Sequence, residues 1–446
     1  MNRRTIWISL MAAALFVGGT IGFIWWATQS PGQVQDFLIR MVFVTLLLFL
    51  GILFVRYFTL LWFGYLQHAE RNVTRGVEDP RELPPVSIIV PAYNEEDVLG
   101  EAIESLMALD YPSYEVIIVD DGSTDATAEV ARRWEGVSDE VEVRVVTKRN
   151  GGKAAALNTG IALAQHPFLL CMDADSWMEP GTLRAAIPHF EDQNVGAVAG
   201  NVKVHNRNNL LTKLQALEYI EGLNMPRRAQ GFIGAVNIVP GPVGIFRKSA
   251  IEDVGGYDTD TFAEDADLTL KLVTTGWKII YEDQAITWTA APDNVLDLIQ
   301  QRYRWTRGLL QAVGKRKRVL VQPFPDFPLW LSVLETAFES IVWPAMNVFA
   351  HLFFAVVALL FGMGELLLYW WFLLTLLDLV IALVTISMEE EDLGLVPYAI
   401  VYRFFFLLFL DVAKTFAALE EALKLGMEWD KVDRVAYQPQ GTKGSA

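Results

Sequence analysis

Carboxylate side chains recur directly after short apolar runs in the middle of this 446-residue chain. Asp121 stands just beyond the run Val116–Val119. Asp173 and Asp175 follow the run Phe168–Met172 in the same way. Carboxylates at this spacing can hold Mg²⁺ or Mn²⁺ through one or two contacts and leave positions for phosphate oxygens. Helix capping is the structural alternative, but it does not account for Asp173 and Asp175 together.

The elements that must position these carboxylates are predicted to form a parallel α/β sheet, because apolar runs alternate with charged, periodic stretches. The expected strands are Val86–Val90, Val116–Val119, Val141–Thr147 and Phe168–Met172, separated by helices near 95–109, from 124 onwards and at 153–164. Ligands bind at the carboxyl ends of such strands. Tyr93 and Glu95 follow the first strand and should lie at this edge, with Asn94 as the expected N-cap of the first helix.

Two common nucleotide-binding motifs are absent from this domain. Pro91–Asp97 contains no glycine, so there is no dinucleotide fingerprint after the first strand. Gly151-Gly152-Lys153 resembles the end of a P-loop, but Thr147 stands where the upstream glycine is required and Ala154 follows the lysine. Lys153 at a helix start would bring positive charge near the carboxylates, and an exposed surface lysine is the alternative.

A second acidic group follows later in the chain, at Ala263-Glu264-Asp265-Ala266-Asp267, where a helix is expected at 267–276. Asp265 could act as a general base that faces the cation site across a pocket. Three acids at a helix N-terminus are also common for electrostatic reasons alone. Upstream, the glycine- and proline-rich loop 239–248 could bring backbone close to a bound sugar.

Composition excludes several classes of protein. The net charge of −17 argues against a nucleic-acid binder that works by phosphate neutralisation. One cysteine excludes a disulfide framework and a cysteine-based metal site. The five histidines show no close paired spacing, which argues against a histidine metal site.

The apolar residues, 52% of the chain, are concentrated at its two ends and predict membrane-spanning helices there. The expected division is two N-terminal transmembrane helices (1–66), a cytoplasmic α/β domain (84–292), amphipathic interface helices (293–340), C-terminal transmembrane helices (341–418) and a polar tail (419–446). Arginines precede the first span and follow the second, which places both flanks in the cytoplasm. Four ionisable residues in or near the later spans should face a pore or pair with neighbouring helices: Asp378, Arg403, Asp411 and Lys414.

Seven short motifs occur in an order that is specific to one family. They are PAYNEE (91–96), DDGSTD (120–125), GGKAAALNTG (151–160), DAD (173–175), GPVGIFR (241–247), AED (263–265) and QRYRW (301–305). With the membrane segments on both sides, this order resembles the processive family 2 glycosyltransferases with a GT-A fold, which include poly-N-acetylglucosamine, hyaluronan, chitin and cellulose synthases. The basic cluster 315–318 and the GPVGIFR loop look closest to the poly-N-acetylglucosamine type.

The resemblance implies a role for each matching residue. The nucleotide sugar would be bound by Tyr93, Glu95, Asp121, Lys153 and Asp173. Asp175, with Asp173, would ligate Mg²⁺ or Mn²⁺, and Asp265 would deprotonate the acceptor hydroxyl with Glu264 beside it. Gln301, Arg304 and Trp305 would lie over the diphosphate and acceptor; membrane-interface anchoring is the alternative for Arg304 and Trp305. The family usually has Thr where this chain has Ala263.

The implied protein is an inverting, metal-dependent transferase that polymerises a β-linked polysaccharide from a UDP-sugar and helps to move it across the plasma or inner membrane. Its expected partners are the UDP-sugar donor, the growing polysaccharide and the bilayer, without nucleic acid, and the resemblance also allows for a small membrane accessory subunit. A non-processive transferase that glycosylates a lipid phosphate would not need Gln-x-x-Arg-Trp. An inactive receptor for nucleotide sugars or polysaccharide would not need Asp175 or Asp265, which are both present.

Overall fold

The computed structural model describes residues 31–74, 83–138, 141–320, 327–360 and 364–425. These residues divide into two compact units, one built from the described part of 1–56 with 349–370 and the other from 57–348 with the described residues after 370. The first predicted span, 5–27, and residues 426–446 of the predicted polar tail lie outside the described residues.

A 9-stranded mixed sheet forms the centre of the larger unit, with the order β3-β4-β2-β1-β5-β8-β7-β9-β6. The strands are β1 (Val86–Ala92), β2 (Tyr114–Asp120), β3 (Gly136–Ser138), β4 (Val141–Thr147), β5 (Phe168–Cys171), β6 (Ser176–Met178), β7 (Val195–Val204), β8 (Gly244–Arg247) and β9 (Lys278–Thr289). Strands β4, β2, β1 and β5 run parallel, which confirms the prediction for this half of the sheet. Strand β8 is antiparallel to both of its neighbours.

Strands β1, β2 and β5 are buried on both faces because they are largely apolar, whereas β4 alternates and exposes Glu142. Ile88 packs with helix α3 (Leu99–Met107) in one core cluster. Its neighbour Ile89 points to the other face and packs with helix α5 (Lys153–Leu163). A Cβ on Gly160 of α5 would lie only 2.3 Å from Cγ2 of Ile89, so this glycine lets helix and strand approach closely. Cys171, the last residue of β5, is buried in the same cluster.

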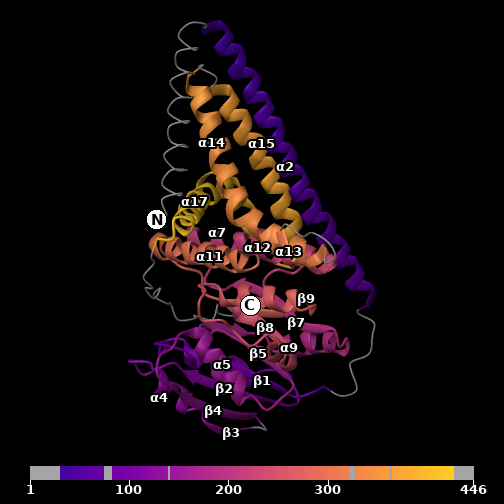
Figure 1. Ribbon diagram of the computed structural model, residues 1–446, viewed down its shortest axis with the longest axis vertical. Helices are drawn as coiled ribbons and strands as arrows, with labels where there is room; N and C mark the ends of the chain where they lie inside the picture. Colours follow the sequence, from indigo (N-terminus) through magenta and orange to yellow (C-terminus); the bar gives the residue numbers. More distant parts are fainter. Residues whose placement is uncertain (1–30, 75–82, 139–140, 321–326, 361–363, 426–446) are drawn as a thin grey trace, which may run out of the picture. The chain divides into compact units, whose positions relative to one another are not determined.

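The remaining helices precede, connect or follow the strands along the chain (Figure 1). Those before residue 321 are α2 (Pro31–Thr74), α4 (Thr127–Arg132), α6 (Thr182–Ala186), η1 (Ile187–Glu191), α7 (Leu210–Glu218), η2 (Tyr219–Asn224), α8 (Met225–Ile233), η3 (Gly241–Val243), α9 (Lys248–Asp253), α10 (Glu264–Thr274), α11 (Val295–Lys315) and α12 (Lys317–Leu320). Later elements are α13 (Phe327–Ala337), η4 (Phe338–Val342), α14 (Trp343–Leu360), α15 (Gly364–Met388), η5 (Leu393–Tyr398), α16 (Ala399–Val401), η6 (Tyr402–Leu407) and α17 (Leu408–Ala422).

Among the described residues, 4 helical segments are long and apolar enough to cross a membrane: Leu47–Ala69, Phe327–Val356, Leu367–Met388 and Leu393–Ala422. Many of their leucine and phenylalanine side chains are exposed, as expected for surfaces that face lipid rather than water. The prediction of an α/β domain that lies in the chain between long apolar helices is therefore confirmed.

The ionisable residues of these apolar helices pair with one another. Arg403 donates to both carboxylate oxygens of Asp378 and to the hydroxyl of Tyr57, and all three are buried. Asp411 accepts a hydrogen bond of 2.6 Å from Asn347. The two predicted explanations for these groups are a pore lining and pairing between helices. Pairing accounts for Asp378 and Asp411, because each carboxylate has a partner on another helical segment.

Candidate active site

The loop after β2 is held by backbone donors from the glycine-rich loop that precedes α5. Asp121 is buried, and its carboxylate accepts hydrogen bonds from the N–H of Gly151 (3.0 and 3.1 Å) and of Gly152 (2.7 Å). Lys148 also pairs with it at 2.6 Å. Gly152 has φ of +86°, a conformation that favours glycine. Asp121 thus fixes the loop that leads directly into Lys153.

The loop after β1 meets the loop after β2 at the same edge of the sheet. The side chain of Asn94 accepts from the N–H of Thr124 (2.8 Å), and the N–H of Glu95 donates to the hydroxyl of Thr127 (2.7 Å). The prediction that Asn94 caps α3 is wrong: Asn94 has φ of +52°, and α3 begins only at Leu99. Because Asn94 uses its side chain to join two loops, it is unavailable for capping. Tyr93 beside it is 39% exposed.

Lys153 lies between two carboxylates from distant parts of the chain. Its Nζ is 2.7 Å from Oδ1 of Asp173 and 2.9 Å from Oε1 of Glu264. Burial alone would lower the pKa of this ammonium, but Asp173, Glu264 and Asp265 together raise it, so Lys153 is charged at neutral pH. These four residues form what we call the Lys153 cluster. The alternative of an exposed surface lysine is therefore wrong.

The glycine-rich loop at 241–247 approaches the Lys153 cluster with its backbone. A Cβ at Gly241 would lie 2.9 Å from Nζ of Lys153 and 3.3 Å from Oδ2 of Asp173. Any side chain at this position would push into the ion pair, which explains why glycine stands at the start of η3.

Asp265 stands in the first turn of α10, next to Glu264. Its Oδ1 accepts a hydrogen bond of 2.8 Å from the N–H of Ala266. Burial, followed by the neighbouring charge of Glu264, raises the pKa of Asp265 from 3.8 to about 6. A carboxylate with this pKa is ionised at neutral pH and is a better proton acceptor than an ordinary aspartate.

The donor set at the end of β5 fits a divalent cation of the Mg²⁺ or Mn²⁺ type. Asp173 and Asp175 supply hard carboxylate oxygens, and both side chains are partly buried rather than fully solvated. One oxygen of Asp173 is paired with Lys153, so the protein supplies only part of a coordination shell. Such incomplete sets suit a cation that is also bound by the phosphates of its substrate.

Among the described residues, a second group of carboxylates lies outside the Lys153 cluster. Asp258, Asp260 and Asp267 place oxygens within 4.8 Å of one another. Three basic side chains already neutralise them: Lys271, Lys315 and Arg316. These six residues form what we call the Asp267 cluster. Because each carboxylate has a basic partner, this group serves as an ion-pair network and not as a metal site.

The Asp267 cluster joins α10 to the C-terminal end of α11. Asp267 is completely buried, and its Oδ1 accepts from Nη1 of Arg316 at 2.5 Å. Lys315 Nζ lies 3.1 Å from its other oxygen. One turn earlier in α11, the side chain of Gln311 accepts a hydrogen bond from the N–H of Phe262. A Cβ on Gly308 would lie 2.4 Å from the backbone nitrogen of Ala263, so this glycine lets α11 approach the loop closely. Helix α11 therefore holds the loop that leads into Glu264 and Asp265 at the start of α10.

The Gln-x-x-Arg-Trp residues lie on α11, with neighbours that fix their orientation. Burial lowers the pKa of the Arg304 guanidinium. The negative charges of Glu264, Asp173 and Asp265 act in the opposite direction. The guanidinium of Arg302 lies over the ring of Trp305, 4.2 Å from its centroid, and contacts the side chain of Gln301. This cation–π contact holds the indole of Trp305 in place. The structure thus brings Arg304 within electrostatic range of the Lys153 cluster.

No motif in the sequence predicts the helical segment that lies beside Trp305. Glu218 accepts from two nitrogens of Arg302 at 3.0 and 2.6 Å. Tyr219, the first residue of the π-helical turn η2, has its ring centroid 6.4 Å from that of Trp305. Arg227 of α8 is buried, and the charge of Asp265 acts on it. Only the pairing of distant segments identifies these residues, since none belongs to a recognisable motif.

Comparison with known proteins agrees with this geometry. Residues 87–255 match the family model described as Glycosyl transferase family 2. Poly-beta-1,6-N-acetyl-D-glucosamine synthase of Staphylococcus aureus strain MSSA476 is 35% identical over 263 residues, which are 59% of this chain and 63% of the relative. The synthase of the same name from Staphylococcus epidermidis is 34% identical over 229 residues, or 51% of this chain and 55% of that protein. The matched regions thus span less than two thirds of these curated relatives.

A solved structure has the same fold. The mannosyltransferase PcManGT from Pyrobaculum calidifontis, in complex with GDP-Man and Mn²⁺, superimposes with a TM-score of 0.60 and covers 87% of this chain and 99% of its own. Its sequence identity is 21%, so this likeness concerns the fold. In sequence, residues 87–255 match the glycosyltransferase family 2 model, and 59% of the chain is similar to a poly-β-1,6-N-acetyl-D-glucosamine synthase.

Proposed function

We propose that this chain is a membrane-embedded, inverting glycosyltransferase that polymerises a β-linked polysaccharide of the poly-N-acetylglucosamine type from a UDP-sugar. The Lys153 cluster is the observation that carries the proposal. It gathers a cation, two carboxylates paired with it and a carboxylate of raised pKa, within a family 2 glycosyltransferase domain. This is the combination that transfer from a nucleotide diphosphate sugar to a hydroxyl group requires.

The donor would bind at the carboxyl edge of the parallel strands. Tyr93 and Glu95 lie in the loop after β1, and Asp121 fixes the loop that leads to Lys153. In this proposal the first two bind the uridine, and Lys153 and Asp173 face the diphosphate. Mg²⁺ or Mn²⁺ on Asp175 and Asp173 would neutralise phosphate charge when bound.

Transfer needs a base for the acceptor hydroxyl and a stable leaving group. Asp265 would accept the proton of the hydroxyl, whose oxygen forms a bond to the anomeric carbon. The bond from that carbon to the phosphate oxygen breaks on the opposite face, and UDP leaves with the bonding electrons. Lys153 and Arg304 would stabilise the charge that develops on the diphosphate. Attack opposite the leaving group inverts the configuration and gives a β-linkage.

The acceptor would stack on Trp305, whose ring is held by Arg302. Apolar helices adjoin this domain in sequence on both sides, so the growing polymer would pass to them directly. In this proposal the protein lies in the plasma or inner membrane, with the transferase domain in the cytoplasm. A small membrane accessory subunit is part of the hypothesis.

A donor panel on the purified chain in detergent, with Mn²⁺ or Mg²⁺, tests the proposal. We expect UDP release and polymer from one UDP-sugar, with UDP-N-acetylglucosamine as the first candidate. Asp265→Asn should reduce kcat about 10³-fold while donor binding persists, because the base is lost and the phosphate site is kept. Equal activity in Asp265→Asn would refute the assignment of the base. Short lipid-linked products alone would instead indicate the non-processive transferase, and donor binding without turnover would indicate a receptor.

A further inference from the structure

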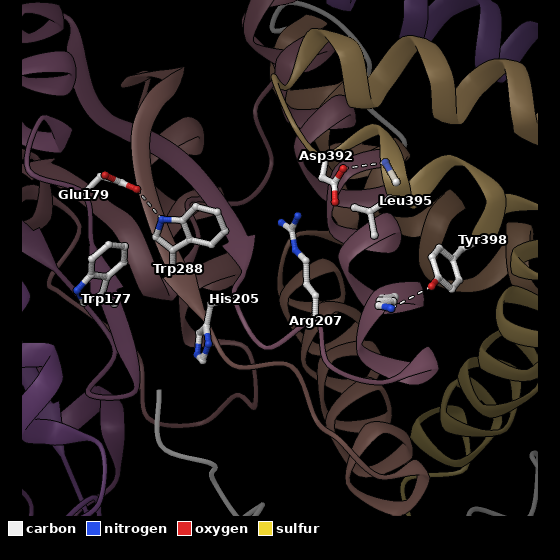
Figure 2. A pocket seen from close by; sticks show the side chains of 10 residues that line it. Trp177, Glu179, His205, Arg207, Trp288, Asp392, Leu395 and Tyr398 are labelled. Carbon is white, nitrogen blue, oxygen red and sulfur yellow. Dashed lines mark hydrogen bonds between the residues drawn. The ribbon is translucent and has the colours of Figure 1, made fainter. Parts of the chain in front are cut away.

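A cavity of about 440 Å³ lies in the larger unit and is lined by none of the residues assigned to the proposed reaction. Its walls come from the β6–β9 edge of the sheet, from the start of α7 and from η5 (Figure 2). The volume falls within the range of about 300–1,000 Å³ that is usual for small-molecule sites.

Two tryptophan rings form one wall of this cavity. Trp177 of β6 and Trp288 of β9 are direct partners in an antiparallel pair, so their side chains stand next to each other on one face of the sheet. The indole N–H of Trp288 donates to Glu179 at 2.8 Å, which fixes the ring orientation (Figure 2). Both rings are only partly buried, although indoles in a sheet are usually covered.

The opposite wall is formed by Tyr398 and the residues around it. Lys213 donates to the hydroxyl of Tyr398 at 3.0 Å and lies 5.2 Å from the centroid of its ring. Arg207 extends between the two walls (Figure 2). Both oxygens of Glu391 hold its guanidinium, at 2.7 and 3.0 Å. The cavity is therefore built from fixed aromatic rings and anchored polar groups, an arrangement that needs little reorganisation on binding.

The charges that line the cavity cancel. Arg207 and Lys213 are cationic, and Glu179 and Asp392 are anionic. Burial and the charge of Arg207 lower the pKa of His205 to about 4, so this imidazole is neutral at physiological pH. Glu391, which is outside the lining, also pairs with Arg207, so the cavity has no excess of positive charge. A lining without net charge has no preference for a nucleotide or other phosphate compound, which would require an excess of cations.

We propose that this cavity is a second saccharide-binding site, which takes one or two neutral sugar units. A pyranose ring has apolar C–H faces that suit the indoles of Trp177 and Trp288 and the ring of Tyr398. Its hydroxyl groups both donate and accept, which matches the mixture of carboxylates, imidazole, ammonium and guanidinium around the cavity. This inference rests on the proposed function only in the choice of sugar, since an enzyme that makes a polysaccharide is surrounded by its own product.

The test is saccharide binding to the full-length chain in detergent, measured by isothermal titration calorimetry and saturation-transfer NMR in the Asp265→Asn background. The probes are N-acetylglucosamine, its β-1,6-linked dimer and trimer, matching glucose and mannose oligomers, and inorganic phosphate. UDP is present at saturation to occupy the donor site. Because no turnover is needed, failure of the proposed polymerisation would leave the binding result interpretable.

We expect a neutral oligosaccharide to bind with an affinity that changes little with salt, and Trp177→Ala to weaken it about tenfold. Trp177→Phe should retain most of the affinity, because it keeps an aromatic face. Trp305→Ala controls for the acceptor site on α11. Trp134→Ala controls for loss of an indole, since Trp134 lies between α4 and β3 at the other edge of the sheet.

Several results would overturn the inference. One is saccharide binding that Trp305→Ala abolishes and Trp177→Ala leaves unchanged, because only the acceptor site would then bind sugar. A second is preferential, salt-sensitive binding of phosphate that Lys213→Met removes. If Trp177→Ala does not fold, Tyr398→Ala on the opposite wall provides the same comparison, and unchanged affinity in that variant is equally decisive against the site.

Discussion

Two acidic clusters share helix α10 but differ in how their charges are compensated. The Asp267 cluster has three carboxylates and three basic side chains, and Asp267 itself is completely buried. In the Lys153 cluster, Asp173, Glu264 and Asp265 share a single lysine. Burial, followed by the negative charge of Glu264, raises the pKa of Asp265, whereas a hydrogen bond from Lys271 lowers the pKa of Asp258 to about 2.

This difference separates a structural network from a site that needs a ligand. A compensated cluster gains nothing from binding another cation, because its carboxylates already have partners. A cluster with excess carboxylates is electrostatically unfavourable until a cation or a hydrogen-bonding substrate arrives. Helix α10 carries residues of both clusters, so one helix both anchors α11 and presents the proposed base.

Arg316→Met should have the largest effect on stability, because it removes a partner of a completely buried carboxylate. We expect the free energy of unfolding to fall by about 3 kcal/mol, measured by thermal denaturation in detergent. Lys315→Met is the matched comparison. Lys315 mainly contacts the more exposed Asp258 and Asp260, so we expect a loss of at most about 1 kcal/mol. Equal effects in the two variants would contradict the central position of Asp267.

Lys153→Met should affect activity more than stability. Lys153 and its partners are partly exposed, at 31% for the lysine and 24% for Asp173, so the fold should tolerate the change. We expect kcat/KM to fall about 10²-fold, because charge on the leaving diphosphate loses a partner. Lys278→Met removes an exposed lysine that pairs with Asp192 and should leave kcat/KM unchanged. A stability loss without a loss of activity would make Lys153 a structural residue.

Glu264→Gln should shift the pH dependence of the reaction. Asp265 accepts a proton only when ionised, so the acidic limb of the kcat/KM profile is expected near its pKa of about 6. The negative charge of Glu264 contributes to raising this pKa, and its removal should move the limb to lower pH by about one unit. Glu252→Gln, at a carboxylate that is 60% exposed, is the control. An unmoved limb would show that another group titrates.

The parallel half of the fold could be predicted because its strands are short, largely apolar runs followed by polar turns. The four expected strands correspond to β1, β2, β4 and β5. The antiparallel half could not be predicted in the same way, since the pairing of β6 with β9 joins residues separated by more than a hundred positions. Local sequence does not encode such pairings, and the cavity between Trp288 and Tyr398 depends on one of them.

The candidate site was predictable to the extent that each motif follows its own strand or opens its own helix. Asp173 and Lys153 are brought together as expected. The proposed metal set follows from spacing. The Asp267 cluster could not be predicted, because its carboxylates are separated in sequence and two of its basic partners come from the far end of α11. Asn94 shows the opposite failure. An asparagine before an expected helix suggests an N-cap, but a hydrogen bond from the loop after β2 holds Asn94 at positive φ.

The only cysteine of the chain has a practical consequence for the experiments above. Cys171 is buried at the end of β5, and burial raises its pKa to about 12. A thiol without thiolate character reacts slowly with alkylating reagents. The natural protein can therefore accept a fluorophore or spin label at a newly introduced surface cysteine without removal of its own, so distance measurements during turnover are within reach of an otherwise unaltered chain.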